Sequence, residues 1–114
     1  MADHEILIQV VGGNIVCPRV HVESHETVSW KCDHPFAVDF GWNTPFKNNG
    51  KSKSRPDPNA AGKKTTDEER INSDASKVGH PIKYKYTVAV YVASDDPTTD
   101  GEILIEDPEV IIDP

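Results

Sequence analysis

The sequence is poor in the residues from which reactive and metal-binding sites are usually built. Its 114 residues include two cysteines, Cys17 and Cys32, and one methionine, Met1. No glycine-rich phosphate loop, GxSxG elbow or paired CxxC motif is present. Nothing in it indicates a pair of carboxylates in an apolar pocket, which acid–base catalysis would favour. We therefore predict that the protein is not an enzyme and carries no cofactor.

Long apolar segments are also lacking. No run approaches the roughly 20 apolar residues that a membrane-spanning helix needs. Residues 1–5 carry neither a basic leader nor an apolar stretch. Two cysteines are too few for a disulfide framework, and free thiols suit a reducing compartment. We expect a cytoplasmic protein that does not bind membranes.

Basic residues are few, and they are concentrated in one region. The formal net charge is −7, which disfavours nucleic acid as a partner. Ten of the twelve basic residues lie between Lys47 and Lys85, whereas residues 95–113 hold eight acidic residues and no basic one. Such regions either solvate different surfaces or bind partners of opposite charge.

What the sequence does contain is a series of short β-strands in a single domain, residues 1–114. In the first half, strands are predicted over residues 5–11, 15–22, 27–32 and 36–42. The signal Gly12-Gly13-Asn14 predicts a turn between the first two, and Pro18 interrupts the second. Residues 27–32 alternate apolar and polar side chains, which is typical of a half-buried strand.

Strand patterns return near the end of the chain, over residues 82–92, 102–105 and 109–112. The first of these would extend about 40 Å if it were straight, so we expect a bend or bulge within it. The last is short, and we expect it at a sheet edge. The predicted core between two sheets consists of Trp30, Phe36, Val38, Phe40, Tyr86, Val88 and Val90.

A long polar insertion, at about residues 41–80, separates the two halves. It is rich in Asn, Gly, Pro, Lys and Ser and has no sustained apolar period. One short helix is predicted near residues 66–69, where Thr-Asp-Glu-Glu fits a capping box. Phe46 and Ile71 are the predicted anchors to the core. Residues 47–64 are expected to be more mobile than the strands.

One order of features runs through nearly the whole chain outside residues 43–80. A strand and glycine turn lead to an apolar-Pro step at Cys17-Pro18. The segment PRVHVESHETVSWK, a Pro-Phe strand at residues 35–40 and the segments YKYTV and DGEILIED follow. In this order the sequence resembles the cupredoxins, the family of blue copper proteins. The resemblance implies an all-β, Greek-key β-sandwich.

The same resemblance implies a copper site whose ligands this sequence lacks. The family binds copper through an early His and through a Cys, a His and usually a Met around the last turn, which together form a trigonal site with a weak axial thioether. The early position corresponds to Phe36, with His34 two residues away. Residues 88–100 contain no Cys, His or Met. We therefore predict the fold without its type-1 copper.

Two functions remain open from the sequence. The leading hypothesis is a non-catalytic cupredoxin-like binding or scaffold domain, with an unknown protein or acidic ligand as its partner. The residues predicted to bind that partner are the basic ones of the insertion, Lys47, Lys51, Lys53, Arg55, Lys63 and Lys64. The alternative is a metal-handling protein with a non-standard Cu or Zn site around Cys32 and His34, which would share one face of a strand. Against it, Cys32 continues the apolar pattern of its strand, as a buried inert thiol does.

Overall fold

The computed structural model describes residues 2–47, 51–72, 79, 81–96 and 98–114, and in these it confirms the all-β class. The described residues form no helix, so none of them could cross a membrane as a helix. The strands are β1 (His4–Leu7), β2 (Gln9–Val11), β3 (Asn14–Val16), β4 (Val20–Glu23), β5 (Thr27–Cys32), β6 (Phe36–Asp39), β7 (Lys51–Lys53), β8 (Arg55–Pro56), β9 (Lys64–Thr65), β10 (Glu69–Arg70), β11 (Ile82–Lys85), β12 (Thr87–Val92), β13 (Glu102–Glu106) and β14 (Glu109–Asp113).

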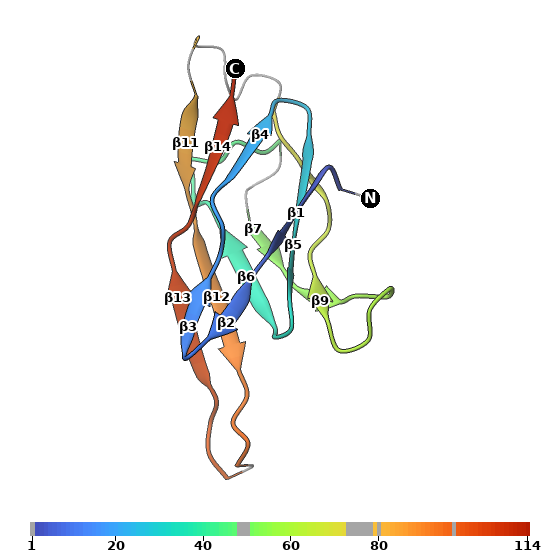
Figure 1. Ribbon diagram of the computed structural model, residues 1–114, viewed down its shortest axis with the longest axis vertical. Coiled ribbons are helices and arrows are strands. Elements are labelled where there is room, and N and C mark those ends of the chain that lie inside the picture. The colour runs from blue at the N-terminus through green and yellow to red at the C-terminus, as the bar shows by residue number, and fades with distance from the viewer. Residues whose placement is uncertain (1, 48–50, 73–78, 80, 97) are drawn as a thin grey trace.

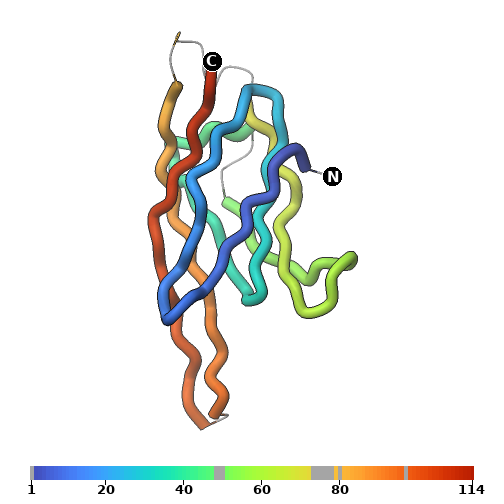
Figure 2. Tube along the Cα trace, in the orientation of Figure 1, coloured from blue at the N-terminus to red at the C-terminus, as the bar shows by residue number. Residues whose placement is uncertain are grey.

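Two larger sheets enclose a common core (Figures 1 and 2). One has the order β1-β5-β9-β8, with β10 also paired to β5, and the other has the order β13-β12-β6-β7. A three-stranded sheet, β11-β14-β4, and the hairpin β2-β3 complete the described strands. The arrangement is sandwich-like and elongated, with extents of 53 × 26 × 22 Å.

The core contains every residue predicted for it. All seven of those side chains are buried. Trp30 stands at the centre, with its ring centroid 6.1 Å from that of Phe40, 5.9 Å from Phe46 and 5.7 Å from Tyr86. Its indole Nε1–H donates to the Tyr86 hydroxyl at 3.2 Å, so the polar atom of each ring has a partner inside the core.

The predicted bend in residues 82–92 is confirmed, and it occurs without a bulge. β11 and β12 both pair with the C-terminal part of the chain, and the break between them falls at Tyr86. Lys85 faces Glu109 and Val88 faces Glu106, so two residues lie between these pairs on each side. The Tyr86 N–H donates to the Pro108 carbonyl at 3.1 Å. Pro108 has no N–H to return, which interrupts the ladder while the register is kept.

The prediction that the C-terminal tail is an edge strand is wrong. β14 lies at the centre of its sheet, antiparallel to β11 and parallel to β4. Val110 and Ile112 are fully buried and Ile111 nearly so. A strand buried on both faces reads as a continuous apolar run, which is the pattern of these residues.

The polar insertion contributes strands to both large sheets, contrary to the expectation of an irregular segment. β7 pairs with β6, and β9 pairs with β5. The Ser54 hydroxyl accepts a 2.8 Å hydrogen bond from the Phe36 N–H, which fixes the insertion to β6. The predicted anchors are confirmed, because Phe46 and Ile71 are buried and form a β-bridge with each other.

The helix predicted near residues 66–69 is wrong, because residues 66–68 form neither helix nor strand and Glu69 begins β10. Lys31 faces Thr65 and Val28 faces Glu69, so three residues of the insertion lie opposite two residues of β5. Such an extra residue is a β-bulge. The Thr66 side chain, expected to cap a helix, instead accepts the Trp30 backbone N–H at 3.0 Å. The long-range pairing with β5, and not the local capping pattern, determines the structure of this segment.

The insertion also changes the burial of β5. Thr27 and Ser29 lie on the face of β5 away from the core, yet they are only 7% and 4% exposed. The prediction of a half-buried strand is therefore wrong, since only Lys31 retains intermediate exposure. Asp57 and Thr66 of the insertion lie near Ser29, and Asp3 accepts a hydrogen bond from the Thr27 N–H, so the insertion and the N-terminal residues cover this outer face together.

Candidate functional site

The outer face of the β13-β12-β6-β7 sheet presents an ordered set of exposed side chains. The strand register fixes its central row as Ile105, Ala89, Ala37 and Lys53, one residue from each strand. Side chains two residues apart on a strand share a face. The neighbouring row therefore begins with the pair Ile103 and Tyr91.

A groove of about 350 Å³ lies on this face. Ala37 and Ala89 occupy the middle strands, and their small side chains leave a depression there. Tyr91 and Ile103 stand on one side of it, and Lys53 stands on the other. The groove is thus apolar in the middle and basic at its β7 edge.

The apolar side chains around this groove are more exposed than packing would require. Ile103 and Ile105 are each 66% exposed and Tyr91 is 43% exposed. Contiguous apolar exposure on a sheet face is unlike scattered surface residues and marks interaction sites. We define these three residues with Ala37, Ala89 and Lys53 as the apolar groove.

The Tyr91 ring packs against the backbone at Gly101, in the connection between β12 and β13. A Cβ atom at Gly101 would lie 2.8 Å from Tyr91 Cζ and 2.4 Å from the Val92 carbonyl oxygen. Only a residue without a side chain therefore allows the ring to lie against this backbone. The position of Tyr91 at the groove depends on Gly101.

The structure brings only part of the predicted basic set to this groove. Lys51 and Lys53 lie on β7, opposite Asp39 and Ala37 and on the same face. The other four are placed elsewhere, in three settings. Arg55 pairs with Asp67 at 2.9 Å, Lys63 pairs with Asp33, and Lys47 and Lys64 have no ion pair within the described chain.

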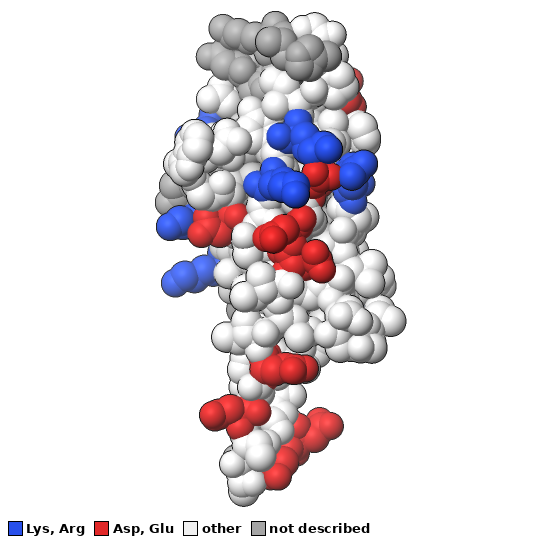
Figure 3. Space-filling view, turned by 90° about the vertical axis from the view of Figure 1, so that its left-hand side faces the viewer, with Lys and Arg blue, Asp and Glu red and all other residues white. Residues whose placement is uncertain are grey.

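Acidic charge collects at the far end of the β12–β13 hairpin. Figure 3 shows acidic side chains along the narrow end of the molecule and basic ones on its broader body. The acidic residues of this connection are Asp95, Asp96, Asp100 and Glu102. The face that carries the groove therefore has a basic edge at β7 and an acidic end beyond Ile103.

Cys32 and His34 lie near each other, at the end of β5 and in the turn that follows it. Cys32 is 1% exposed, and burial raises the pKa of its thiol, which disfavours the thiolate that a metal would bind. His34 is half-buried beside it. Among the described residues no three His, Cys, Asp or Glu side chains are grouped so that they could hold a metal ion.

Cys17 likewise lies in a structural setting. Its Sγ is 3.4 Å from the Tyr86 hydroxyl, and burial raises the pKa of this thiol as well. Both cysteines are free. The two thiols pack as small apolar groups at the edge and in the interior of the core.

The chain matches no known protein-family model and no curated protein sequence.

Sequence reasoning missed the apolar half of the groove. The signal was present in the run Ile103-Leu104-Ile105, since alternate residues of a strand point to opposite faces. Leu104 packs against the core, so its two neighbours had to lie on the outer face. When an edge strand such as β13 is apolar on both faces, the core buries one face and the apolar side chains of the other face remain exposed.

Proposed function

We propose that this protein is a non-catalytic binding module whose apolar groove docks a segment of another protein. The observation that carries the proposal is the exposure of Ile103, Ile105 and Tyr91 on one sheet face next to a lysine-bearing edge strand. A binding surface needs apolar anchors, and aromatic and large aliphatic side chains supply them. The exposed surface of these three side chains is not buried by folding, so it is available to a partner.

The chemistry of the groove selects the kind of segment that fits. Apolar side chains of the partner would fill the depression over Ala37 and Ala89. Acidic side chains of the partner would face Lys51 and Lys53 at the β7 edge, because complementary charge sets orientation and association rate. The occupant is therefore a protein segment that combines apolar anchors with acidic residues.

The proposed class is a cupredoxin-like Greek-key domain without type-1 copper. The sandwich-like all-β architecture supports the class. Phe36, at the position of the family's early His, is buried and faces Val90 across the sheet, so an apolar pair occupies that place. Residues 88–100 supply no thiolate, imidazole or thioether.

No observation favours the alternative metal-handling function. Cys32 is buried with a raised thiol pKa, and among the described residues it belongs to no group of three or more His, Cys, Asp or Glu side chains that could hold a metal ion. Zinc and copper sites in proteins need three or four ligands. One tight equivalent of Cu²⁺ or Zn²⁺, lost in Cys32→Ser or His34→Ala, would nevertheless establish it.

A selection of displayed random peptides tests the docking proposal directly. The wild-type protein is the bait, and the enriched peptides are then assayed against the Ile103→Ser variant. We expect enriched peptides to combine apolar and acidic residues. The matched control is Leu7→Ser, which removes an apolar side chain 52% exposed on β1, outside the groove.

The outcomes separate the alternatives. Peptides that bind wild type and Leu7→Ser but not Ile103→Ser support the groove. Peptides that bind all three proteins equally would place the binding surface elsewhere. A stable homodimer seen by light scattering and lost in Ile103→Ser would assign the face to a second copy of this chain, and would overturn a foreign partner.

A further inference from the structure

The floor of the apolar groove consists of two alanines between larger side chains. Ala37 and Ala89 face each other on the middle strands, in a row that ends with Ile105 on β13 and Lys53 on β7. Neighbouring strands are about 4.8 Å apart, so the backbones at the two ends of this row are separated by about 14 Å. Between them the row carries only two methyl groups. The groove therefore accepts a wide, flat group that lies on the sheet.

One wall of the groove is itself an aromatic ring. Tyr91 lines the groove, faces Ile103 on β13 and is exposed. Its N–H donates to the Pro35 carbonyl at 2.9 Å, so Pro35 continues this wall toward β6. Aromatic rings meet other rings in offset or edge-on arrangements, and these pairs add stability beyond the area that they bury. The wall therefore favours an aromatic occupant over an aliphatic one of equal size.

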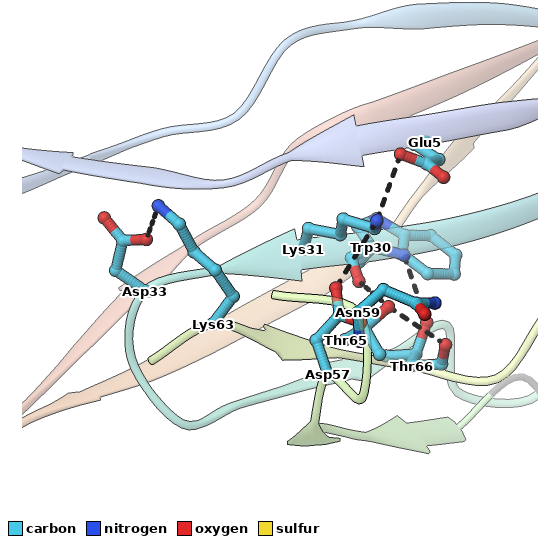
Figure 4. A network of polar contacts seen from close by, with 9 residues as sticks. All are labelled: Glu5, Trp30, Lys31, Asp33, Asp57, Asn59, Lys63, Thr65 and Thr66. Atoms are coloured by element: carbon cyan, nitrogen blue, oxygen red, sulfur yellow. Dashed lines mark hydrogen bonds and ion pairs between the residues drawn. The ribbon is translucent and has the colours of Figure 1, made fainter. Parts of the chain in front are cut away.

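The opposite end of the groove holds a cation without a counter-charge in the described chain. Lys53 lines the groove, and its ammonium group has no ion pair or hydrogen bond with any described residue. On the other sheet, by contrast, Lys31 Nζ lies 3.3 Å from Glu5 Oε2 and 3.5 Å from Asp57 Oδ2 (Figure 4). A cation within about 6 Å of an aromatic ring is attracted to the face of that ring. Lys53 is thus available to a ring that lies on the groove floor.

The other polar side chain of the groove already has a structural partner. Ser54 Oγ accepts the Phe36 N–H at 2.8 Å. Among the described residues that line the groove, none carries a carboxylate or an imidazole. An occupant therefore meets an apolar floor, a ring and one cation. An aliphatic side chain would use only the first of these, whereas an aromatic side chain uses all three.

We propose that the docked segment is anchored by one aromatic side chain, a Phe, Tyr or Trp, which lies over Ala37 and Ala89 between the Tyr91 ring and the Lys53 ammonium group. The inference rests on the proposed function, because it names the anchor of the segment that the groove docks. Aromatic side chains bury large apolar areas at interfaces and are frequent among the residues that dominate binding energy.

The aromatic anchor is compatible with the acidic residues proposed for the same segment. A lysine ammonium group has three N–H donors, so contact with a ring leaves donors for a carboxylate beside it. Lys51 lies on the same strand and face as Lys53 but does not line the groove. The segment therefore combines an aromatic residue on the floor with acidic residues along the β7 edge.

The position of the anchor is tested by NMR with peptides selected by display on the intact wild-type protein. A ring that lies on the groove floor shifts the methyl signals of Ala37 and Ala89 upfield through its ring current, whereas an aliphatic side chain has no ring current. We expect both signals to move upfield as the protein is saturated. The methyl signal of Ala61, an exposed residue outside the groove, is the internal reference and should not move.

The chemistry of the anchor is tested by changing the peptide. Its aromatic residue is set to phenylalanine and then replaced by cyclohexylalanine, which keeps a similar size and apolar surface but has no π-electrons. Fluorescence anisotropy gives the Kd of each peptide for the wild-type protein. We expect cyclohexylalanine to raise the Kd by about three- to tenfold, because the contacts with the Tyr91 ring and the Lys53 charge are lost.

Two matched protein variants identify the cation. Lys53→Met keeps an unbranched side chain and removes the charge, and it should reduce the ratio of the two Kd values by about twofold or more. Lys51→Met makes the same change on the same strand and face, outside the groove lining. It should leave the ratio unchanged, even where loss of a contact with an acidic residue weakens both peptides alike.

Each result decides the inference. Upfield shifts at Ala37 and Ala89, together with a Kd ratio that depends on Lys53 and not on Lys51, establish the aromatic anchor. Peptides that require Ile103 but contain no aromatic residue, or that bind equally well with cyclohexylalanine, overturn the anchor and leave the proposed function standing. A ratio that Lys53→Met leaves unchanged also overturns it. If no selected peptide depends on Ile103, the proposed function and the anchor both fail.

Discussion

The two large sheets differ in what lies over their outer faces. The β13-β12-β6-β7 sheet leaves its apolar groove open, with Ile103 and Ile105 mostly exposed. The β1-β5-β9-β8 sheet has its outer face covered by the insertion, so that Ser29 and Asp57 are buried although they are polar. Apolar side chains are thus exposed on one face and polar side chains are buried on the other.

The insertion connects the two faces. Its first strand, β7, forms the basic edge of the groove, whereas β9 pairs with β5 and β8 pairs with β9 in the other sheet. A mobile basic segment that only bound a partner through its lysines would not need strands paired with both sheets. The insertion is therefore part of the folded structure, because its short strands pair with both sheets.

The largest effect is expected in the core that lies under both faces. Trp30→Ala removes a fully buried ring that packs on three other aromatic rings. We expect it to lower the free energy of unfolding by about 3–5 kcal/mol. Urea unfolding measures the change, and Trp42→Ala, at a side chain 94% exposed, should have little effect. A loss below about 1 kcal/mol would contradict the central position of Trp30.

The covered face is broken most simply at the bulge. Thr66→Val removes the acceptor of the buried Trp30 N–H, and this should cost about 1–3 kcal/mol in unfolding free energy. Thr65→Val should cost less, because the Trp30 carbonyl still accepts the Thr66 N–H at 3.1 Å. Urea unfolding of both variants checks the order, and equal losses would mean that the bulge does not depend on Thr66.

The open face is broken at Gly101. An alanine there brings a Cβ to 2.4 Å from the Val92 carbonyl oxygen, so the hairpin backbone must shift. We expect a loss of about 1–3 kcal/mol, as for other overpacked sites, together with a displaced Tyr91 ring. Gly79→Ala is the control, since a Cβ there meets nothing within 4 Å. Thermal melts and the NMR signals of Tyr91 report the two effects, and an unchanged Tyr91 would show that Gly101 does not position it.

Acid pH distinguishes the covered face from the open one. The folded-state pKa of Asp57 is below its ordinary value of 3.8. Its ionised form therefore adds stability that is fully present above that value and is lost as pH falls through the lower folded-state pKa. The difference in stability between wild type and Asp57→Asn should be constant at neutral pH and shrink as the pH falls below about 4. Unfolding curves across pH measure it, and a difference that grows in acid would reverse the assigned sign.

The smallest effect on stability is expected within the groove. Ile103→Ser changes an exposed side chain and should alter the free energy of unfolding by no more than about 0.5 kcal/mol. Urea unfolding against wild type gives the value. A loss of several times this size would mean that Ile103 is part of the folded core, and that its exposure needs no partner.

Local patterns in the sequence predicted the strands and the core, because alternation in a strand reports directly which face is buried. Trp30 and Tyr86 were placed correctly on that basis, as were the anchors Phe46 and Ile71. The turn at Gly12-Gly13 also lies where the local signal puts it.

Long-range pairing explains what the sequence did not show. The short strands β7, β8 and β9 have no apolar period, since their pairing depends on the strands β5 and β6 that receive them. The capping pattern beginning at Thr66 is equally compatible with a bulge once Trp30 offers its N–H. The exposed pair Ile103 and Ile105 could have been predicted from the alternation of their strand, but the rest of the groove could not, because it joins residues that only the sheet register brings together.

The affinity of a peptide selected on the wild-type protein alone, measured for three proteins, tests the central claim most directly. Fluorescence anisotropy gives its Kd for wild type, Ile103→Ser and Leu7→Ser. The account predicts that Ile103→Ser weakens the binding by about tenfold or more, as loss of an interface anchor does, whereas Leu7→Ser leaves the Kd unchanged. An equal Kd for all three proteins would contradict the claim that the open apolar face is a docking surface.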